Sequence, residues 1–346
     1  MTIRFLKETA FRPKLLRCME RYRDLSEKVS LTVGIYRNGS FYVLGDDGLS
    51  LRYDIGSISK TLTAHLILSL AERGLIALDK TVDHYIDLKK GNYPTVYELL
   101  THTAGYHHLT PIEITLPSLI LHGYARKNVY ENCTSKTVKK CLSRRRYHKK
   151  SHPYGYSDFP YAILAVVAEQ VTGEPFSALF EQFVHDKLGM KETFLHIDPD
   201  AREPKPVIGN CTVGFWKWKR QNPYISAGGL VSTVTDMLHY IELQIECGDS
   251  YITGAHCLCE ASISPKSNVS MCIGWHTYKN SNQLWHVGGV STFRSSVIIN
   301  KPKKLGVVVL GNAKGVSSAN VHYLAKMLYS ELKMKRIDFT KYETRR

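Results

Sequence analysis

Residues 52–74 read RYDIGSISKTLTAHLILSLAERG and place a serine and a lysine at the start of a long apolar segment. The apolar pattern predicts a helix over 58–73, and Gly74 is typical of the position just after a helix end. Ser57 then stands at the N-terminal boundary of this helix, and Lys60 follows three residues later on the same face. We therefore expect the two side chains to meet.

A serine and a lysine in contact suit nucleophilic catalysis. A serine hydroxyl is a weak nucleophile at neutral pH and must pass its proton to a base, and a lysine serves as that base when burial or neighbouring cations lower its pKa. The backbone N–H groups and positive dipole end of a helix start favour a developing oxyanion. The same S-x-x-K spacing recurs at Ser330 and Lys333, within a charged stretch that indicates an exposed helix face.

Length and composition predict one large globular domain or two intimately packed ones. The chain has 346 residues, 43% of them hydrophobic and 22% charged, which is enough to bury a sizeable core. The first thirty residues carry charges throughout and lack the apolar block of a secretory signal, and no later run reaches the ~18 apolar residues of a membrane span. We expect a cytoplasmic protein without a membrane partner.

The cysteines favour free buried thiols over a metal site or disulfides, because they are scattered without a C-x2-C pair. They are Cys18, Cys133, Cys141, Cys211, Cys247, Cys257, Cys259 and Cys272. No H-E-x-x-H or similar ligand spacing occurs in the sequence. We therefore expect neither a metal nor a cofactor.

Positive charge is in excess, with 46 Lys and Arg against 31 Asp and Glu, and it is concentrated in RRRYHKK, residues 144–150. This run is interpreted either as a solvated basic loop or as a contact for an anionic partner, such as an acidic group of a substrate. A nucleic-acid partner is not favoured, since no zinc knuckle, aromatic RNP pattern or recognition-helix signature accompanies the charge.

Strand-like segments flank a helical middle. The stretch LTVGIYRNGSFYVLG, residues 31–45, predicts a hairpin around Asn38-Gly39, because both residues tolerate positive φ. Helical patterns continue to about residue 245, including PYAILAVVAEQVTG, which Gly173 closes. Strands return in MCIGWHTY, QLWHVGG, FRSSVIIN and LGVVVLGN, with a KPKK turn, and a helix over SSANVHYLAKMLYSELKMKR closes the chain.

Strands from both ends of the chain must pair around this helical insertion. We therefore expect an α+β fold (an α/β sandwich), in which an antiparallel β-sheet flanked by helices carries an inserted, mostly helical lobe. The sheet lobe is expected at about 1–75 and 215–346, and the helical lobe at about 76–214, within a single catalytic domain. Clefts form between such lobes.

Two further motifs follow Ser57 and Lys60 in chain order, the triplet Tyr156-Ser157-Asp158 and an H-x-G-G run over residues 286–289. With them the sequence resembles the serine β-lactamase and penicillin-binding-protein family, in its class C-like branch. That family's signature is S-x-x-K with S-D-N and K-T-G, and the class C branch carries Y-x-N as its second element. The resemblance covers most of the chain and implies a β-lactamase/transpeptidase-like fold. Its phrases are YDIGSISKTLTAHLILSLAERGLIALDKTV, YPTVYELLTHTAG, YGYSDFPYAILAVVAEQVTGEPF, KLGMKET, ISAGGLVSTVTDM, LWHVGGVSTFRSS and LGVVVLGN.

The resemblance implies a role for each motif residue. Ser57 matches the acylated nucleophile, Lys60 the lysine bonded to it, and Tyr156 the tyrosine that exchanges protons with the nucleophile and leaving group, its pKa lowered by neighbouring cations. The backbone N–H groups of Ser57 and Gly289 would form the oxyanion hole. Glycines at Gly288 and Gly289 suit a substrate that runs close to the strand, although a glycine pair can also mark a β-bulge.

Two residues depart from the family pattern at positions expected to bind substrate. Asp158 replaces an asparagine, so a group that only accepts hydrogen bonds stands where an amide would both donate and accept. It could pair with Lys60 and raise the pKa of that lysine, or be offset by nearby His and Arg side chains. His286 replaces the lysine of K-T-G and lessens the fixed positive charge where β-lactams place their carboxylate.

The remaining histidines are interpreted as supporting residues. His102, in LLTHTAG, resembles a family phrase that holds a turn after a helix. His107, His108 and His152 are expected at the cleft rim, in the segment 106–153 that should build the substrate pocket.

The motifs together predict a serine hydrolase that works through an acyl-serine intermediate on a small-molecule or peptide substrate. An esterase or peptidase, including one for substrates with D-amino acids, is favoured, and a transacylase uses the same chemistry with another acceptor. The alternative is a β-lactamase or D,D-carboxypeptidase. A non-enzyme alternative is a catalytically silent scaffold with the same fold. The sequence leaves the oligomeric state open.

Overall fold

The computed structural model describes residues 2–7, 10–11, 13–23, 30–44, 49, 51–108, 111–122, 128–145, 147, 153–196, 216–262, 267–312, 318–334 and 339–344. The strands are β1 (Ile3–Leu6), β2 (Ser30–Arg37), β3 (Ser40–Leu44), β4 (Arg52–Asp54), β5 (Phe194–Leu195), β6 (Leu230–Thr233), β7 (Leu258–Ser262), β8 (Val269–Cys272), β9 (His276–Tyr278), β10 (Gln283–Val290), β11 (Phe293–Asn300), β12 (Leu305–Asn312) and β13 (Glu343–Thr344). The α-helices are α1 (Pro13–Arg23), α2 (Ser59–Glu72), α3 (Val96–Leu100), α4 (Ile112–His122), α5 (Ser135–Arg144), α6 (Phe159–Thr172), α7 (Phe176–Gln182), α8 (Ile225–Gly228), α9 (Val234–Glu246), α10 (Ser250–Thr253) and α11 (Ser318–Met334).

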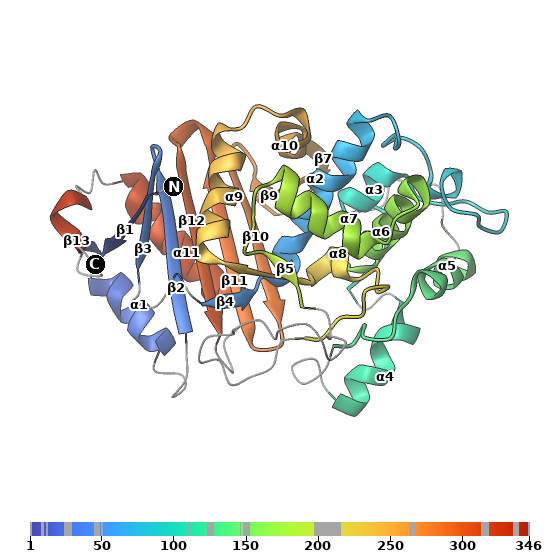
Figure 1. Cartoon of the computed structure of the whole chain (residues 1–346), viewed down its shortest axis with the longest axis horizontal. Coiled ribbons are helices and arrows are strands. Elements are labelled where there is room, and N and C mark those ends of the chain that lie inside the picture. Colours follow the sequence, from blue (N-terminus) through green and yellow to red (C-terminus); the bar gives the residue numbers. More distant parts are fainter. Residues whose placement is uncertain are drawn as a thin grey trace.

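A ten-stranded sheet forms one side of the molecule, in the order β13-β1-β3-β2-β12-β11-β10-β9-β8-β7 (Figure 1). Strands from both ends of the chain pair at β2 and β12, as expected. The α+β class is confirmed, but the sheet is mixed rather than wholly antiparallel, because β1 runs parallel to β3. A parallel pair needs a connection of a dozen or more residues, which the segment containing α1 and β2 supplies.

The local predictions for the sheet are largely confirmed. Asn38 and Gly39 turn between β2 and β3 with φ of 48° and 79°. The strand expected over 271–278 is instead the end of β8 and all of β9, separated by a turn at Gly274, whose φ is 76°. A Cβ on Gly274 would lie 2.8 Å from Ala64 Cβ, so the turn fits closely against α2 only with a glycine.

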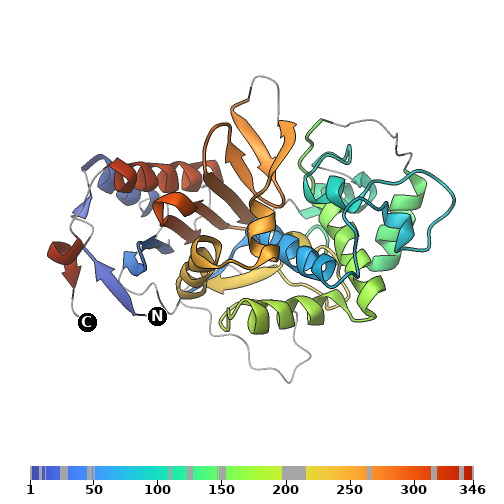
Figure 2. The same ribbon diagram turned by 90° about the horizontal axis from the view of Figure 1, so that it is seen from above.

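Helices cover both faces of the sheet (Figure 2). Helix α11 packs on β11 and β12 and shares one apolar cluster with α1, whereas α9 packs on the opposite face against β2 and β12. Helices α3 to α6 group on the far side of α2 from β2 and β3 (Figure 1). A small sheet in the order β4-β6-β5 contacts α7 through β5 and the large sheet through β4.

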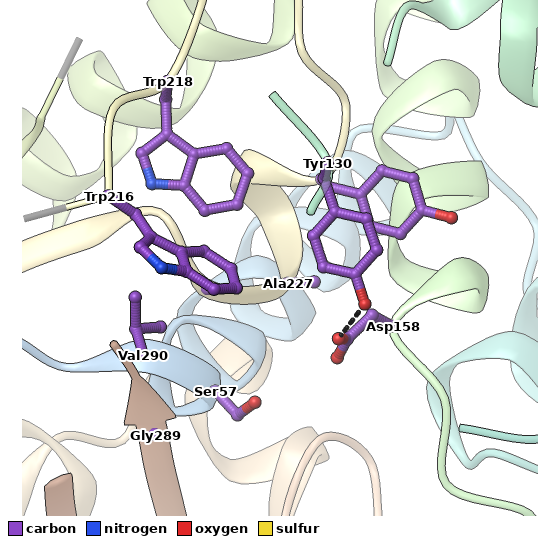
Figure 3. A pocket seen from close by; sticks show the side chains of 10 residues that line it. Ser57, Tyr130, Asp158, Trp216, Trp218, Ala227, Gly289 and Val290 are labelled. Atoms are coloured by element: carbon purple, nitrogen blue, oxygen red, sulfur yellow. Dashed lines mark hydrogen bonds between the residues drawn. The ribbon is translucent and has the colours of Figure 1, made fainter. Parts of the chain in front are cut away.

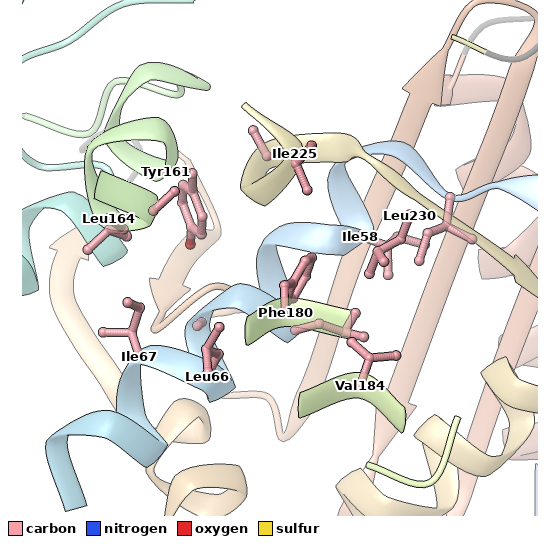
Figure 4. Packing of buried hydrophobic residues seen from close by; sticks show 14 of the residues in the cluster. Ile58, Leu66, Ile67, Tyr161, Leu164, Phe180, Val184, Ile225 and Leu230 are labelled. Atoms are coloured by element: carbon pink, nitrogen blue, oxygen red, sulfur yellow. The ribbon is translucent and has the colours of Figure 1, made fainter. Parts of the chain in front are cut away.

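Helix α2 runs through the centre of the larger apolar cluster. It begins within one residue of the expected position, and Gly74 follows its end with a φ of 72°. Its side chains are buried on almost every face, and Leu66 and Ile67 face apolar side chains of α6 and α7 (Figure 4). Burial of large apolar side chains stabilises such a core by about 1.5–3 kcal/mol each. The segment that carries the S-x-x-K motif is therefore firmly held.

Within the described part of the chain, no single helix is long and apolar enough to cross a membrane. One pair, α6 with Phe176–Lys187, passes by length and composition when taken together, although the two parts are bent by 87°. The α6 residues Phe159 to Ala168 are buried in the protein core.

Candidate active site

Ser57 stands in a tight turn between β4 and α2. The turn is a short 3₁₀ segment, Gly56–Ile58, and its first N–H, on Gly56, donates to the buried Asp54 carboxyl at 3.0 Å. Gly56 has a φ of 50°, and a Cβ there would lie 2.6 Å from the Gly289 backbone nitrogen. A glycine is thus required at this position, because any Cβ there would meet the Gly289 backbone at a positive φ.

The structure brings Lys60 onto Ser57, as the helical spacing predicts. Lys60 Nζ donates to Ser57 Oγ at 2.9 Å and to the Ala227 carbonyl at 2.7 Å. Burial lowers the pKa of Lys60, and the nearby Asp158 carboxylate opposes this shift without cancelling it. A lysine with a lowered pKa can accept the proton of the serine hydroxyl.

Tyr156 joins this pair directly ahead of α6. Lys60 Nζ lies 5.1 Å from the centre of the Tyr156 ring. Burial raises the pKa of Tyr156, the Asp158 charge raises it further, and a hydrogen bond with Ser57 acts in the opposite direction. The expected lowering by neighbouring cations is therefore wrong for this structure, because the cost of burying a phenolate and the carboxylate nearby outweigh Lys60. Tyr156 stands beside Ser57 as a neutral phenol.

Asp158 forms a buried ion pair with Lys60, at 2.6 Å between Nζ and Oδ1. Its second oxygen accepts the Tyr130 hydroxyl at 2.8 Å. Burial alone would raise the pKa of the Asp158 carboxyl, but Lys60 and the Tyr130 hydrogen bond hold it below its usual value, with a smaller contribution from His108. The sequence left open whether Asp158 pairs with Lys60 or is offset by nearby His and Arg side chains. In the structure it pairs mainly with Lys60.

His286 lies on β10 next to Tyr156, with ring centres 6.4 Å apart. Its Nδ1 lies 2.8 Å from the Val287 carbonyl oxygen, and burial lowers the pKa of the imidazole well below its usual value. The position that carries a lysine in the K-T-G pattern is thus occupied by a buried neutral ring.

Two more buried imidazoles flank Tyr156. His276 lies on β9, directly across from Trp285 on β10. Its Nε2 forms a hydrogen bond with the Tyr154 hydroxyl at 3.0 Å, and burial lowers the pKa of the imidazole to about 3. His102 adopts a φ of 56° just after α3 and lies 4.7 Å from the Tyr156 ring, centre to centre. A turn position after a helix is what the sequence indicates for His102, whereas His276 carries no local signal and was missed.

The two glycines of the H-x-G-G run do different things. A Cβ on Gly288 would lie 2.0 Å from the Ile55 carbonyl oxygen, so Gly288 is needed for packing of β10 against the Ser57 turn. Gly288 is not among the described residues that line the pocket, whereas Gly289 is, and the expected substrate contact of Gly288 stays a prediction. The ladder from β10 to β11 keeps its register through both residues, so the β-bulge alternative is wrong.

A small pocket, partly open to solvent, lies in front of Ser57. Asp158 and Gly289 line it together with an aromatic group that the sequence analysis missed (Figure 3). The aromatic group is Tyr130, Trp216, Trp218 and Tyr224. The only available signal was the density of aromatic residues in FWKWKRQNPY, just ahead of the ISAGG phrase. Among the described residues that line this cavity there is no lysine or arginine.

Other predicted residues lie away from this cavity. His107 and His108 are exposed, with His108 6.3 Å from Tyr156 between ring centres. His152 and most of the 144–150 run lie outside the described residues, and of that run Arg145 pairs with Glu113 at 2.6 Å. Ser330 and Lys333 are exposed on α11, as expected.

Four cysteines with described side chains, Cys133, Cys141, Cys247 and Cys257, are free thiols, and Cys133 and Cys141 among them are buried. Cys211 and the Cys259 side chain lie outside the described set. In the described portion of the chain, no group of three His, Cys, Asp or Glu side chains is arranged to hold a metal ion.

Ser57, the buried Lys60 that contacts it and the Gly289 backbone beside Gly56 form a site of the S-x-x-K type. The family model for β-lactamases matches residues 48–329, and the chain belongs to this family, whose members are serine hydrolases.

Individual relatives are distant. The chain is 22% identical over 296 residues to protein flp of Staphylococcus aureus (strain MW2), which covers 80% of this chain and 55% of flp. It therefore spans about half the length of that curated relative.

Solved structures share the fold across nearly the whole chain. The octameric penicillin-binding protein homologue from Pyrococcus abyssi superposes with a TM-score of 0.72 at 21% identity, covering 94% of this chain and 78% of that one. A D-stereospecific amidohydrolase from a Streptomyces species gives a TM-score of 0.67 at 23% identity, covering 92% and 98%. These similarities establish the β-lactamase/transpeptidase fold.

Proposed function

We propose that this protein hydrolyses an ester or amide through an acyl-serine intermediate, acting as an esterase or peptidase. The observation that carries the proposal is the contact of Lys60 Nζ with Ser57 Oγ at 2.9 Å, at the mouth of a cavity that Gly289 also lines. Similarity to a D-stereospecific amidohydrolase supports an amide that contains a D-residue. Water is the acceptor in this proposal, and a transacylase would use another nucleophile in the same step.

In the first step Lys60 is in its neutral amine form, which burial favours, and it takes the hydroxyl proton as Ser57 Oγ bonds to the substrate carbonyl carbon. The carbonyl electron pair moves onto oxygen, which the N–H groups of Ser57 and Gly289 stabilise. The carbonyl then re-forms, the bond to the leaving group breaks, and Tyr156, as a phenol, delivers a proton to the leaving group and is reprotonated from Lys60. Water resolves the acyl-serine by the reverse sequence, which yields the acid and restores Ser57.

A β-lactamase or D,D-carboxypeptidase is the second candidate, and membership of the β-lactamase family favours it. The neutral His286 and the Asp158 carboxylate disfavour it, because neither offers a cation to a substrate carboxylate. Cytoplasmic location and the lack of nucleic-acid and membrane partners stay predictions.

Intact-protein mass spectrometry tests the proposal. The protein is incubated separately with a fluorophosphonate, p-nitrophenyl acetate and benzylpenicillin, beside Ser57→Ala and the matched control Ser330→Ala. Ester turnover and a phosphonate adduct that Ser57→Ala alone abolishes would support an esterase or peptidase. A stable penicilloyl adduct or rapid penicillin hydrolysis would favour the second candidate. Labelling by none of the reagents would indicate a silent scaffold.

A further inference from the structure

The cavity in front of Ser57 has aromatic walls. Tyr130 and Tyr224 stack in parallel with ring centres 4.0 Å apart, and Trp216 meets Tyr130 edge to face at 6.4 Å. Trp218 lies beside Trp216 at 6.1 Å and completes the wall opposite the tyrosines (Figure 3). Aromatic faces attract cations as well as apolar groups, with tryptophan the strongest.

The one carboxylate among the described residues that line this cavity is that of Asp158, and no lysine or arginine is among those described residues. The imidazoles of His102, His276 and His286 near Tyr156 are buried and neutral. The exposed His108 ring lies 6.3 Å from the Tyr156 ring and makes a small contribution to the lowered pKa of the Asp158 carboxyl. Lys60 already contacts one Asp158 oxygen, but each carboxylate oxygen can accept more than one hydrogen bond.

We propose that this cavity binds a protonated amine on the acyl group of the substrate, so that the preferred substrates are α-aminoacyl esters or amides with a free amino group. The inference rests on the proposed acyl-serine chemistry and names its substrate class. The amine would lie between the Asp158 carboxylate and the aromatic walls, while the carbonyl carbon reaches Ser57.

The geometry fits an amine close to the carbonyl. Lys60 Nζ lies 2.9 Å from Ser57 Oγ and 2.6 Å from Asp158 Oδ1, so the nucleophile and the carboxylate are separated by a single bridging atom. A short acyl group spans that gap, and an α-amino group sits one carbon from the reacting carbonyl. An acidic acyl group would meet Asp158 with like charge.

A bound amine would also act on Lys60. A second cation beside Asp158 competes for the carboxylate that now favours the charged lysine, and it repels the Lys60 ammonium directly. Both effects favour release of the lysine proton once substrate is bound. A substrate with a free amine would then help to form the base that activates Ser57.

Matched p-nitroanilides test the inference. Phenylalanine p-nitroanilide, its N-acetyl and N-succinyl derivatives, and 3-phenylpropanoyl p-nitroanilide share one aromatic acyl frame, and both enantiomers of the chiral ones are used. We expect kcat/KM for the free amine to exceed that of the N-acetyl and 3-phenylpropanoyl compounds roughly tenfold or more. Equal or better turnover of the N-acetyl or N-succinyl compound would overturn the inference.

Asp158→Asn provides the decisive variant. It also disturbs Lys60, so the readout is the ratio of free-amine to N-acetyl activity within the same variant. We expect that ratio to fall to about one in Asp158→Asn and to fall severalfold in Trp216→Leu, which removes one aromatic face. An unchanged ratio in Asp158→Asn would contradict the inference, whereas Ser330→Ala should leave every ratio unaltered.

If no anilide is turned over, protection of Ser57 from fluorophosphonate labelling can compare ligands that carry a free amine with N-acetylated ligands. Phenylalaninamide should slow labelling at a lower concentration than N-acetylphenylalaninamide, and equal protection would overturn the inference. Failure of the fluorophosphonate to label Ser57 at all would instead count against the proposed function, so the two failures are distinguishable.

Discussion

Two segments of this chain carry the S-x-x-K spacing on a helix, and their surroundings differ. At α2, Lys60 is fully buried and its ammonium contacts Ser57, Ala227 and Asp158. At α11, Ser330 and Lys333 are exposed to solvent. The same spacing therefore occurs on two helices, but only at α2 is the lysine buried, and there burial lowers the pKa of Lys60. Reactivity depends on what surrounds the motif.

Removal of the two serines should separate the sites most strongly. We expect Ser57→Ala to lower ester or amide turnover at least about a thousandfold, because the acyl-serine bond cannot form. Ser330→Ala should keep wild-type kcat/KM. Steady-state kinetics on the same substrate checks both, and equal effects of the two variants would refute the assignment of Ser57.

Replacement of the two lysines extends the comparison to stability. Lys60→Met leaves the buried Asp158 carboxylate without its ion-pair partner, which should lower the free energy of unfolding by about 3–5 kcal/mol and turnover by about 10²–10⁴-fold. Lys333→Met should stay within about 0.5 kcal/mol of wild type. Urea unfolding measures both, and a fully stable Lys60→Met protein would contradict the buried ion pair.

A buried acid supports the Ser57 site and gives a further test of how it differs from the exposed α11 site. Asp54 accepts the Gly56 N–H in the turn that carries Ser57. Burial raises the pKa of its carboxyl to about 8. The folded state then keeps a proton that the unfolded state loses near pH 4, so the contribution of Asp54 to stability falls as the pH rises from about 4 to about 8.

Asp54→Asn keeps an oxygen that can accept the Gly56 N–H and removes this titration. We expect Asp54→Asn to gain stability relative to wild type with rising pH, by a few kcal/mol between pH 4 and pH 8. Melting temperatures of both proteins across that range test the sign. A constant difference between them would show that Asp54 does not titrate in this window.

The smallest effect is expected at Gly56. Gly56→Ala places a Cβ against the Gly289 backbone at a positive φ, which should destabilise the fold by about 1–3 kcal/mol. The displaced Gly289 N–H should also lower kcat more than it raises KM, because the oxyanion hole acts in the transition state. Gly39→Ala is a matched control, since it has a positive φ but nothing within 4 Å of its Cβ, and it should leave kcat intact.

Much of the fold followed from local patterns. The Asn38-Gly39 turn, the bounds of α2 and the Gly173 end of α6 are confirmed within about a residue, because each depends on positive-φ tolerance or on helical periodicity. The parallel pairing of β1 was missed, since a four-residue strand gives no local sign of its neighbour. The split at Gly274 reflects its contact with Ala64, which is distant in sequence.

The sequence by itself determined that Ser57 and Lys60 meet, because three residues along a helix is one turn in any protein. Only the tertiary structure decided that Asp158 would pair with Lys60, that burial would raise the pKa of Tyr156, and that His276 would join the site. The aromatic walls of the cavity are likewise assembled from segments that are far apart in the chain. Desolvation and charge interactions depend on the whole set of neighbours in space, and residue spacing specifies only those on the same helix or turn.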